Sequence, residues 1–493
     1  MEKNRGSLTV FMSLILSLLV ALTCTSLESV RMAAARVQIL CGMDIGLYSL
    51  MAGYDRELLR DYGMFFLDGG YGSSNLDQGK ICDTFREYME GVLRQNYQSL
   101  RWKEGGIEGY TLATDGQGNL FYRQAVRYVR DNLGVSGLQL LIDHMVRNSK
   151  SSREAEQFWK NSGENGSLSA YEEEMIHASQ ESHDASIEMG EEEEETLPGE
   201  FGDGNVGGGV KPTVENPIPV IQRIQRMGLL GLVLPYQQGI SDKKANTSSM
   251  VSKRRLNEGM GADISDTEDG LDGRVLFHEY ILKKLGNYTK PAEGELSYEA
   301  EYVLLGKKSD EENLKGIAKR LLIIREGLNL GFLMANPEKR GQTEALALAI
   351  ASAFLVPPAQ GIITMALLLC WSFAESILDL RALFYGDKTA AIKTAETWQL
   401  SLHNLPRLLD RIDIDRKNPE NGLDYKDYLR ILLFMEKENE LCMRCMDMVE
   451  SRIRISGRPD FSLDTCIGEI QLWADVEANG RKTYSISRSM SYE

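Results

Sequence analysis

The sequence predicts an α+β protein that is mainly helical and carries a single N-terminal transmembrane helix. Three observations support this prediction: an uncharged apolar run, a strongly acidic stretch that divides the chain, and helical periodicity that ends in a hairpin signal. In chain order we expect a short cytosolic leader (1–7), a transmembrane helix (8–27), a helical extension with a small membrane-proximal α+β module (28–148), a disordered acidic linker (149–216), and a mainly helical extracytoplasmic domain ending in a β-hairpin (217–493).

The apolar run from Leu8 to Leu27 contains no charged side chain. Twenty helical residues that each rise about 1.5 Å span roughly 30 Å, the thickness of a bilayer's hydrocarbon core. Lys3 and Arg5 precede the run, whereas Glu28, Arg31 and Arg36 follow it. This modest bias of positive charge favours a cytoplasmic N-terminus, so we expect the bulk of the chain outside the cell.

The same region admits several kinds of processing. A signal peptidase would use the small residues 33–35, although these follow a long apolar run and two charges. A lipoprotein signal would use Cys24, but Thr23 stands before it, where a smaller residue is usual. A prepilin-type start would end a basic leader at Gly6 and begin the mature helix at Ser7. An uncleaved single-span anchor is the plain alternative.

The net charge of −17 is concentrated in the acidic linker. Residues 151–216 hold 17 acidic and 3 basic side chains, so the remainder of the chain is close to neutral. High like charge with low hydrophobicity predicts disorder, because such a segment buries too little apolar surface to offset its chain entropy. Nucleic-acid binding needs clustered Lys and Arg, and the composition argues against it.

The region between the membrane span and the linker shows alternating helical and strand-like patterns. We expect a helix that continues beyond Leu27, with breaks at its glycines, and a second helix at 85–97. Residues 108–134 predict a strand, a glycine-rich turn at Asp115-Gly116, a second strand and then a helix.

Helical signals dominate the region after the linker. Residues 218–235 predict a short helix followed by a buried strand. The clearest helix begins at a capping box formed by Ser309 and Glu312 and ends at Asn336-Pro337.

The most apolar part of this region is a pair of segments, 345–378, split by Pro357-Pro358. Each half is shorter than the roughly 18–20 residues that a membrane span needs, so we expect two core helices, with a membrane hairpin as the alternative. A long amphipathic helix is expected at 422–453. Alternation over 470–476 followed by Asn479-Gly480 then predicts the closing hairpin.

No catalytic constellation is expected. The sequence contains no GxSxG elbow, no P-loop and no HExxH motif. Gly202, Gly204 and Gly207 match GxGxxG, but they lie in the linker without the strand and helix that a dinucleotide site requires. We therefore expect neither enzyme activity nor a cofactor or metal ion.

Weaker thiol and metal patterns are better explained as ordinary structure. Cys442 and Cys445 form CxxC inside a predicted helix, whereas a redox pair sits at a helix N-terminus after a strand. An incomplete match to a Ca²⁺ loop is interpreted as a solvated turn; its acids are Asp413, Asp415 and Asp424. A second loop, 241–272, carries acids interpreted in the same way: Asp263, Asp266, Asp269 and Asp272.

One charge pattern needs a structural explanation. Arg325 falls on the same helical stripe as Leu321 and Leu328, and Glu375 and Asp379 lie one turn apart in a very apolar segment. Because buried charges need partners, we expect Arg325 to pair with Glu375 or Asp379 between two core helices. Acid–base chemistry by the two carboxylates is the alternative.

Five stretches resemble an uncharacterised family of Clostridia-type, Gram-positive proteins: RGSLTVFMSLILSLLVALTCTSLESVR, FFLDGGYG, GLLGLVLP, YEAEYVLLGKKSDEENLKGIAKRLLIIREGLN and ETWQLSL. The resemblance covers nearly the whole chain except the acidic linker and the 241–272 loop. It implies relatives of TadE/TadG-type minor pilins, which accompany tight-adherence (Flp) pilus systems. Pilins are cut after a glycine and usually carry Glu at the fifth mature position, where this chain has Phe11. The resemblance implies no catalytic residue.

Together these observations predict a membrane-anchored extracytoplasmic component, minor-pilin-like, of a tight-adherence pilus or secretion machine. Its partners would be the bilayer, through residues 8–27, and pilin or pilus-assembly proteins. The alternative is a surface-anchored binding protein without a pilus role, and an extracytoplasmic enzyme is the third reading.

Overall fold

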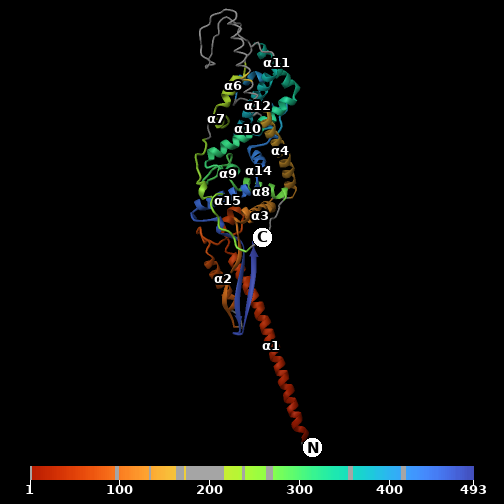
Figure 1. Ribbon diagram of the computed structural model, residues 1–493, viewed down its shortest axis with the longest axis vertical. Helices are drawn as coiled ribbons and strands as arrows, with labels where there is room; N and C mark the ends of the chain where they lie inside the picture. Colours follow the sequence, from red (N-terminus) through yellow and green to blue (C-terminus); the bar gives the residue numbers. More distant parts are fainter. Residues whose placement is uncertain are drawn as a thin grey trace, which may run out of the picture. The chain divides into compact units, whose positions relative to one another are not determined.

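The computed structural model describes residues 3–94, 99–132, 135–162, 171, 173, 216–235, 239–261, 270–353, 359–411 and 418–492. The chain divides into two compact units, and Figure 1 shows their elements coloured along the sequence. Unit 1 comprises Met1–Leu133, Ser248–Tyr280 and Glu438–Glu493, and unit 2 comprises Gly134–Thr247 and Ile281–Lys437. Mainly helical secondary structure with a C-terminal hairpin, as predicted, is confirmed.

Unit 1 begins with one long helix, α1 (Lys3–Met51), which continues without a break through its glycines. Breaks at Gly42 and Gly46 are therefore wrong, whereas the helix does end shortly before Gly53. Gly42 and Gly46 instead face the second helix, α2 (Gln78–Leu93); a Cβ at Gly46 would lie 2.9 Å from the Phe85 ring. Glycines four residues apart lie on one helix face, so their missing side chains let the two helices approach closely.

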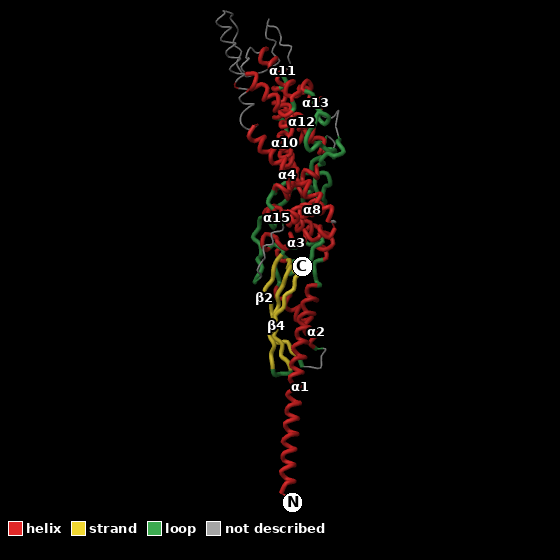
Figure 2. Tube along the Cα trace, turned by 90° about the vertical axis from the view of Figure 1, so that its right-hand side faces the viewer, coloured by secondary structure: helices red, strands yellow, loops and turns green. Residues whose placement is uncertain are grey.

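An antiparallel sheet packs against these two helices (Figure 2). Its central strand is β3 (Cys466–Ala478), which pairs with the long strand β2 (Leu100–Leu112) on one side. On the other side it pairs with β4 (Lys482–Ser491) and the short β1 (Leu67–Asp68). Alternate β3 side chains are buried in the core with α1 and α2, as expected for a sheet covered on one face; they are Ile470, Leu472, Ala474, Val476 and Ala478.

The hairpin turns at Asn479-Gly480 as predicted, and both residues have positive φ (54° and 66°). Its place in the fold differs from the expectation, because we assigned it to the 217–493 domain. Strand β3 instead completes the sheet of the module predicted at 28–148. Pairing over such a separation depends on the whole fold, and the local pattern of a strand does not contain it.

The other elements of unit 1 are mainly short or helical. They are a π-helical turn (Leu58–Tyr62), α3 (Asp115–Asn132), α15 (Glu438–Ile455), a 3₁₀ turn (Leu463–Thr465) and the first part of α8 (Leu271–Lys284). The second strand predicted within 108–134 is wrong, since α3 occupies that place. Positive φ at Gly116, Gln117 and Gly118 makes a tight left-handed turn, and apolar residues after it recur at helical spacing.

Unit 2 is a helical assembly. Its described elements are α4 (Val135–Ser162), α6 (Ile218–Gln225), α7 (Leu229–Val233), a 3₁₀ turn that begins in it (Thr247–Ser249), α9 (Glu299–Leu305), α10 (Asp310–Ala335), α11 (Pro337–Ala353), α12 (Gln360–Phe384), a 3₁₀ segment (Leu402–Arg407), α13 (Leu408–Arg411) and α14 (Tyr425–Met435). The buried strand expected within 218–235 is wrong, because α7 and its extended C-cap take that place.

Helix α10 confirms the clearest sequence signal. The Ser309 hydroxyl accepts a hydrogen bond from the Glu312 backbone N–H at 3.2 Å, and the helix ends at Asn336. In contrast, the long helix expected at 422–453 is two helices. Glu436 has extended backbone (φ −93°, ψ 172°), so α14 ends there and α15 starts at Glu438.

Two described helices are long and apolar enough to cross a membrane, α1 and α12. Helix α12 is mostly buried inside unit 2, as the prediction of core helices requires, whereas the apolar N-terminal part of α1 is fully exposed. Pro357-Pro358 lie outside the described residues.

The first part of the predicted linker, 149–216, is helical. Residues 149–162 continue α4, and Ser149, Ser152 and Ala155 are buried there. Gly327 of α10 explains the close fit, because a Cβ at this glycine would lie 2.1 Å from the Ala155 carbonyl oxygen. Most of the remaining linker, including its GxGxxG match, lies outside the described residues.

Candidate functional site

The most unusual surface of the molecule is the N-terminal part of α1. Its large apolar side chains are bare: Leu8, Leu18 and Leu22 are 64 %, 70 % and 60 % exposed. Figure 1 shows this part of the helix running free of the sheet. A continuous apolar surface of this kind marks a membrane or protein contact, because water solvates it poorly.

Hydroxyl groups in this segment bond to the helix itself. Ser13 donates to the Val10 carbonyl at 2.8 Å, Ser17 donates to the Leu14 carbonyl at 2.8 Å, and Thr23 donates to the Val20 carbonyl at 2.9 Å. Thr25 and Ser26 both donate to the Leu22 carbonyl. These side chains therefore need no water, which is the condition that a hydrocarbon environment imposes.

An apolar stripe continues along α1 beyond the predicted span. Val30, Val37, Ile45 and Tyr48 are 65 %, 58 %, 47 % and 65 % exposed, and the thiol-bearing Cys41 among them is also exposed. At about 100° per residue these positions fall on one face of the helix. The opposite face is buried in the core of unit 1; it carries Ala35, Ile39, Met43, Leu47 and Leu50.

Gly6 and Ser7, the prepilin-type cleavage candidates, lie within the first turns of α1. Phe11, at the fifth position after that peptide bond, is 59 % exposed. Cleavage between Gly6 and Ser7 stays a prediction.

The structure brings Arg325 and Asp379 together in unit 2. The Arg325 guanidinium donates to the Asp379 carboxylate at 2.7 and 3.0 Å, and both side chains are fully buried. Arg325 also donates to Tyr428 Oη at 3.0 Å and to backbone carbonyls at 2.9 and 3.1 Å. Its donors are thus satisfied within the core.

Glu375 does not pair with Arg325. Its partner is Lys393 instead. The Lys393 ammonium lies 2.6 Å from the Glu375 carboxylate and 2.7 Å from the Asp379 carboxylate. Burial would raise the pKa of Asp379, but Arg325 and Lys393 outweigh it and lower that pKa. Burial raises the pKa of Glu375, although Lys393 opposes the shift. Sequence reasoning missed Lys393, because it lies in a loop without periodicity.

The four charges of this network are paired with one another inside the core. Two cations face two carboxylates, and backbone N–H groups of Gln399 and Leu400 donate to Glu375 at 2.9 Å. All four charged side chains are at most 2 % exposed, so a substrate cannot reach them.

The remaining candidates have structural roles where they are described. Cys442 and Cys445 are buried inside α15, and burial raises the pKa of Cys442 to about 12. Asp424 caps α14 through a capping box with Asp427. Asp272 lies in the first turn of α8; the other candidate loop acids, Asp263, Asp266, Asp269, Asp413 and Asp415, lie outside the described residues.

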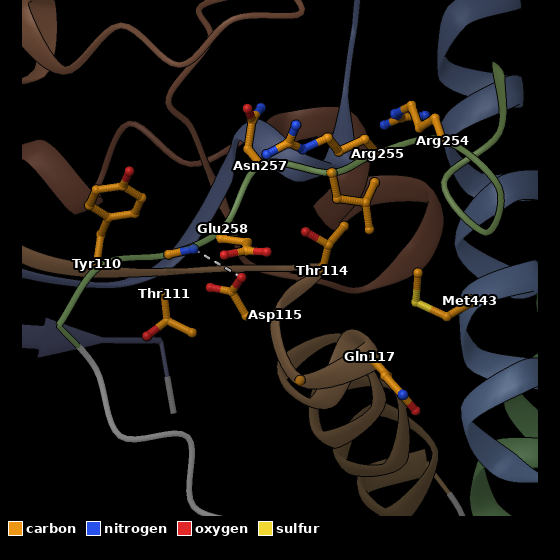
Figure 3. Close-up of a pocket in the computed structure, with 13 residues that line it drawn as sticks. Tyr110, Thr111, Thr114, Asp115, Gln117, Arg254, Arg255, Asn257, Glu258 and Met443 are labelled. Atoms are coloured by element: carbon orange, nitrogen blue, oxygen red, sulfur yellow. Dashed lines mark hydrogen bonds between the residues drawn. The ribbon is translucent and has the colours of Figure 1, made fainter.

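A pocket in unit 1 was not predicted from the sequence. It has a volume of about 520 Å³ and lies between the end of β2, the start of α3 and the segment 254–259 (Figure 3). Thr111 and Thr114 line it, both are 4 % exposed, and their hydroxyls have no hydrogen-bond partner in the described part of the chain. Unsatisfied buried hydroxyls destabilise a fold, so their presence needs an explanation.

Asp115 sits beside these threonines and accepts from the backbone N–H groups of Leu112 (2.7 Å) and Gly259 (3.0 Å). Burial raises the pKa of Asp115, and nearby Glu258 adds to the shift. Arg254 is occupied by Glu450 and Asp464. The pocket lining thus combines two unpaired hydroxyls with charged side chains of both signs, Arg255 and Glu258 among them.

The fold and site define a mainly helical protein with an exposed apolar N-terminal helix. Residues 208–478, more than half of the chain, match a family of unknown function (DUF5702), and the chain belongs to this family. The matched range includes most of unit 2 and strand β3 but not α1 or β2. Comparisons with curated proteins and with solved structures gave no match.

Proposed function

We propose that the chain is a membrane-anchored extracytoplasmic structural component, a minor-pilin-like part of a tight-adherence type pilus or secretion machine. The main support for this proposal is helix α1. Its N-terminal part is apolar and exposed, whereas its C-terminal part is packed in the core of unit 1. One unbroken helix would couple a membrane span rigidly to a folded module. The resemblance of the chain's start to minor pilins supports the same role.

Lateral packing would be the mechanism. The stripe from Val30 to Tyr48 extends the apolar surface past the charges at the end of the span and points away from the sheet. A neighbouring N-terminal helix could cover this stripe along its length, since side chains at this spacing form a helix–helix seam.

The mature N-terminus tests the pilus assignment. The full chain, extracted from membranes, is analysed by the mass of its N-terminal peptide. We expect a start at Ser7, because a prepilin peptidase would cut after Gly6, and we expect Gly6→Leu to block the cut. A start at Met1 would contradict prepilin processing, and a start near Arg36 would remove the anchor altogether.

A photocrosslink from Cys41 tests the lateral contact. Cys24 and Cys82 are replaced by serine, which leaves Cys41 as the one accessible thiol among the described residues. A benzophenone maleimide on Cys41 is expected to capture the N-terminal helix of a pilin-type subunit or of a second copy. The matched control keeps Cys24 instead, which lies off the stripe. Capture of lipid alone from Cys41 would contradict helix packing there.

A surface-anchored binding protein is the second candidate, and the pocket beside Thr111 and Thr114 favours it. Thr111→Val with Thr114→Val would remove two unpartnered hydroxyls, so the free energy of unfolding should stay equal or rise by about 1 kcal/mol. If the pocket serves binding, the same change should abolish ligand capture. Co-purification with pilin subunits separates the two candidates, since a plain binding protein would not bring them down.

A further inference from the structure

Several contacts place one end of the unit 1 sheet at the base of the exposed helix. Tyr484 Oη donates to the Met32 carbonyl of α1 at 3.2 Å, and Arg481 in the hairpin turn pairs with Glu28. The start of β2 lies at the same end, because Leu100 pairs with Ala478 and the Asn479 N–H donates to the Ser99 carbonyl at 2.8 Å. This end of the sheet is thus level with residues 28–32, immediately after the apolar run.

Positive charge gathers at this end. We call it the basic collar, and it consists of Arg31, Arg101, Lys103, Arg481 and Lys482. These five cations come from α1, β2, the hairpin turn and β4. Carboxylates lie among and beside them: Glu28 pairs with Arg481, and Glu477 pairs with Lys103 at 2.6 Å. Glu104 and Asp475 face each other across the strands one position further from the turn.

The collar remains available to a partner. Arg481 and Lys103 keep 71 % and 53 % of their side chains exposed, in spite of their ion pairs. Arg31, Arg101 and Lys482 are exposed and have no ion pair among the described residues; the Lys482 ammonium lies 4.9 Å from the centre of the Tyr484 ring. Exposed pairs contribute little to stability, so these charges are poorly explained by folding alone.

The position of the collar indicates which kind of partner it contacts. Arg31 follows Leu27 by four residues, about 6 Å along a helix. A bilayer that contains the span therefore places its headgroups within about one Debye length of the collar, roughly 8 Å at physiological salt. Basic side chains at this depth are attracted to anionic lipids.

We propose that the basic collar docks the hairpin end of unit 1 onto anionic lipid headgroups and so holds the sheet against the membrane surface. This inference rests on the proposed membrane anchor. Docking would fix the direction in which α1 leaves the bilayer, because the helix and the sheet share one core. A flexible tether, in contrast, would leave the module free to tilt.

The test uses the full chain reconstituted into vesicles of neutral phosphatidylcholine or of phosphatidylcholine with about one third phosphatidylglycerol. Hydrogen exchange of the hairpin turn, 478–483, is measured by mass spectrometry after flotation. We expect several-fold slower exchange in the anionic vesicles, and loss of the difference in 0.5 M salt, because salt screens the attraction.

Two triple variants make the test specific. Arg31→Gln, Arg101→Gln and Lys482→Gln together should remove the lipid-dependent protection. Lys308→Gln, Lys315→Gln and Lys319→Gln, which lie exposed in unit 2, should leave it intact.

Each remaining outcome counts against the collar. Equal exchange in both vesicle types, with the chain floating in both, would overturn lipid docking by the collar. It would not contradict the membrane anchor. Protection in neutral vesicles on adding inorganic phosphate would show phosphate binding without a lipid surface, and would overturn lipid docking as well. A chain that floats with neither vesicle would overturn the anchor and the collar together.

Discussion

At the scale of single residues, the buried charges of unit 2 show which ion-pair partners a sequence pattern can predict. Arg325 could be assigned a partner because it interrupts an apolar stripe, and a charge on such a stripe must be neutralised locally. Asp379 could be proposed because it lies on another apolar helix. Lys393 could not be assigned, since no periodicity marks a loop residue, and it pairs with Glu375 while Arg325 pairs with Asp379.

Asp379→Asn should destabilise unit 2 strongly. The change leaves Arg325 and Lys393 facing each other with one carboxylate fewer, and removing one member of a buried network costs about 3–5 kcal/mol. Urea unfolding measures the loss. The control is Glu344→Gln in the exposed pair Arg340–Glu344, expected to change the free energy of unfolding by less than about 1 kcal/mol. Similar effects of both substitutions would contradict the buried network.

Glu326 of α10 gives a prediction of pH dependence. It is 4 % exposed, and burial raises its pKa from 4.5 to about 8. Between these values the folded chain keeps a proton that the unfolded chain releases, so this residue's contribution to stability falls as the pH rises from about 4.5 to 8. Glu326→Gln removes the dependence. Its stability relative to wild type should therefore grow by up to about 4 kcal/mol between pH 5 and pH 8.

Denaturant unfolding at pH 5, 6.5 and 8 measures this trend, with Glu311→Gln on the exposed side of the same helix as the control. A difference between Glu326→Gln and wild type that stays constant over this range would mean that Glu326 is solvated.

At the scale of secondary-structure elements, strong and redundant signals predicted well. Helix α10 has a cap, a periodic stripe and a stop, and all three agree with the structure. Short apolar runs did not predict well: residues 120–122 and 229–233 are helical where strands were expected. A run of this length fits a buried strand and a buried helix equally, and only tertiary packing decides between them.

The glycines of α1 also show the limit of local propensity. In isolation they suggest a broken helix, but packing against α2 gives them a different role. Gly46→Ala should destabilise unit 1 by about 1–3 kcal/mol, because the buried Phe85 ring must move. The control is Gly42→Ala, where the new methyl group would lie 3.6 Å from Leu93, an ordinary contact. It should stabilise the helix by up to about 1 kcal/mol.

Thermal unfolding of the two variants measures this contrast. Equal stabilisation by both substitutions would show that α1 and α2 do not approach as closely at Gly46 as the structure indicates.

At the scale of the whole molecule, the order of segments along the chain was predicted better than their assembly. Composition marks the apolar start and the acidic stretch, and periodicity marks most helices. Unit 1 is assembled from three separated stretches of the chain, and no local sequence pattern indicates this. Strand β3 has the same alternation of apolar and polar residues whichever strand it pairs with. The pocket beside Thr111 escaped prediction for the same reason.

A fragment of residues 28–148, the module expected from the sequence, should therefore not fold alone. It lacks β3, so β2 would expose its backbone on both edges and the apolar faces of α1 and α2 would lose their sheet. Circular dichroism should show no cooperative thermal transition.

The full chain without residues 466–493 tests the same dependence. Limited proteolysis is expected to cut within 52–132 while 299–384 stays resistant. Deletion of the acidic residues 189–200 is the control and should leave the digestion pattern of both regions unchanged. A cooperative transition in the 28–148 fragment would contradict the shared sheet.

The long separation between β2 and β3 along the chain has a further consequence for biosynthesis. Chains emerge from the ribosome N-terminus first, and domains generally fold as their sequence becomes available. Strand β2 must therefore wait unpaired until residues 113–465 have been made. A translation product interrupted in this range would keep an open strand edge, and proteases act on unfolded segments. Closure of the sheet in unit 1 thus reports that synthesis has passed β3.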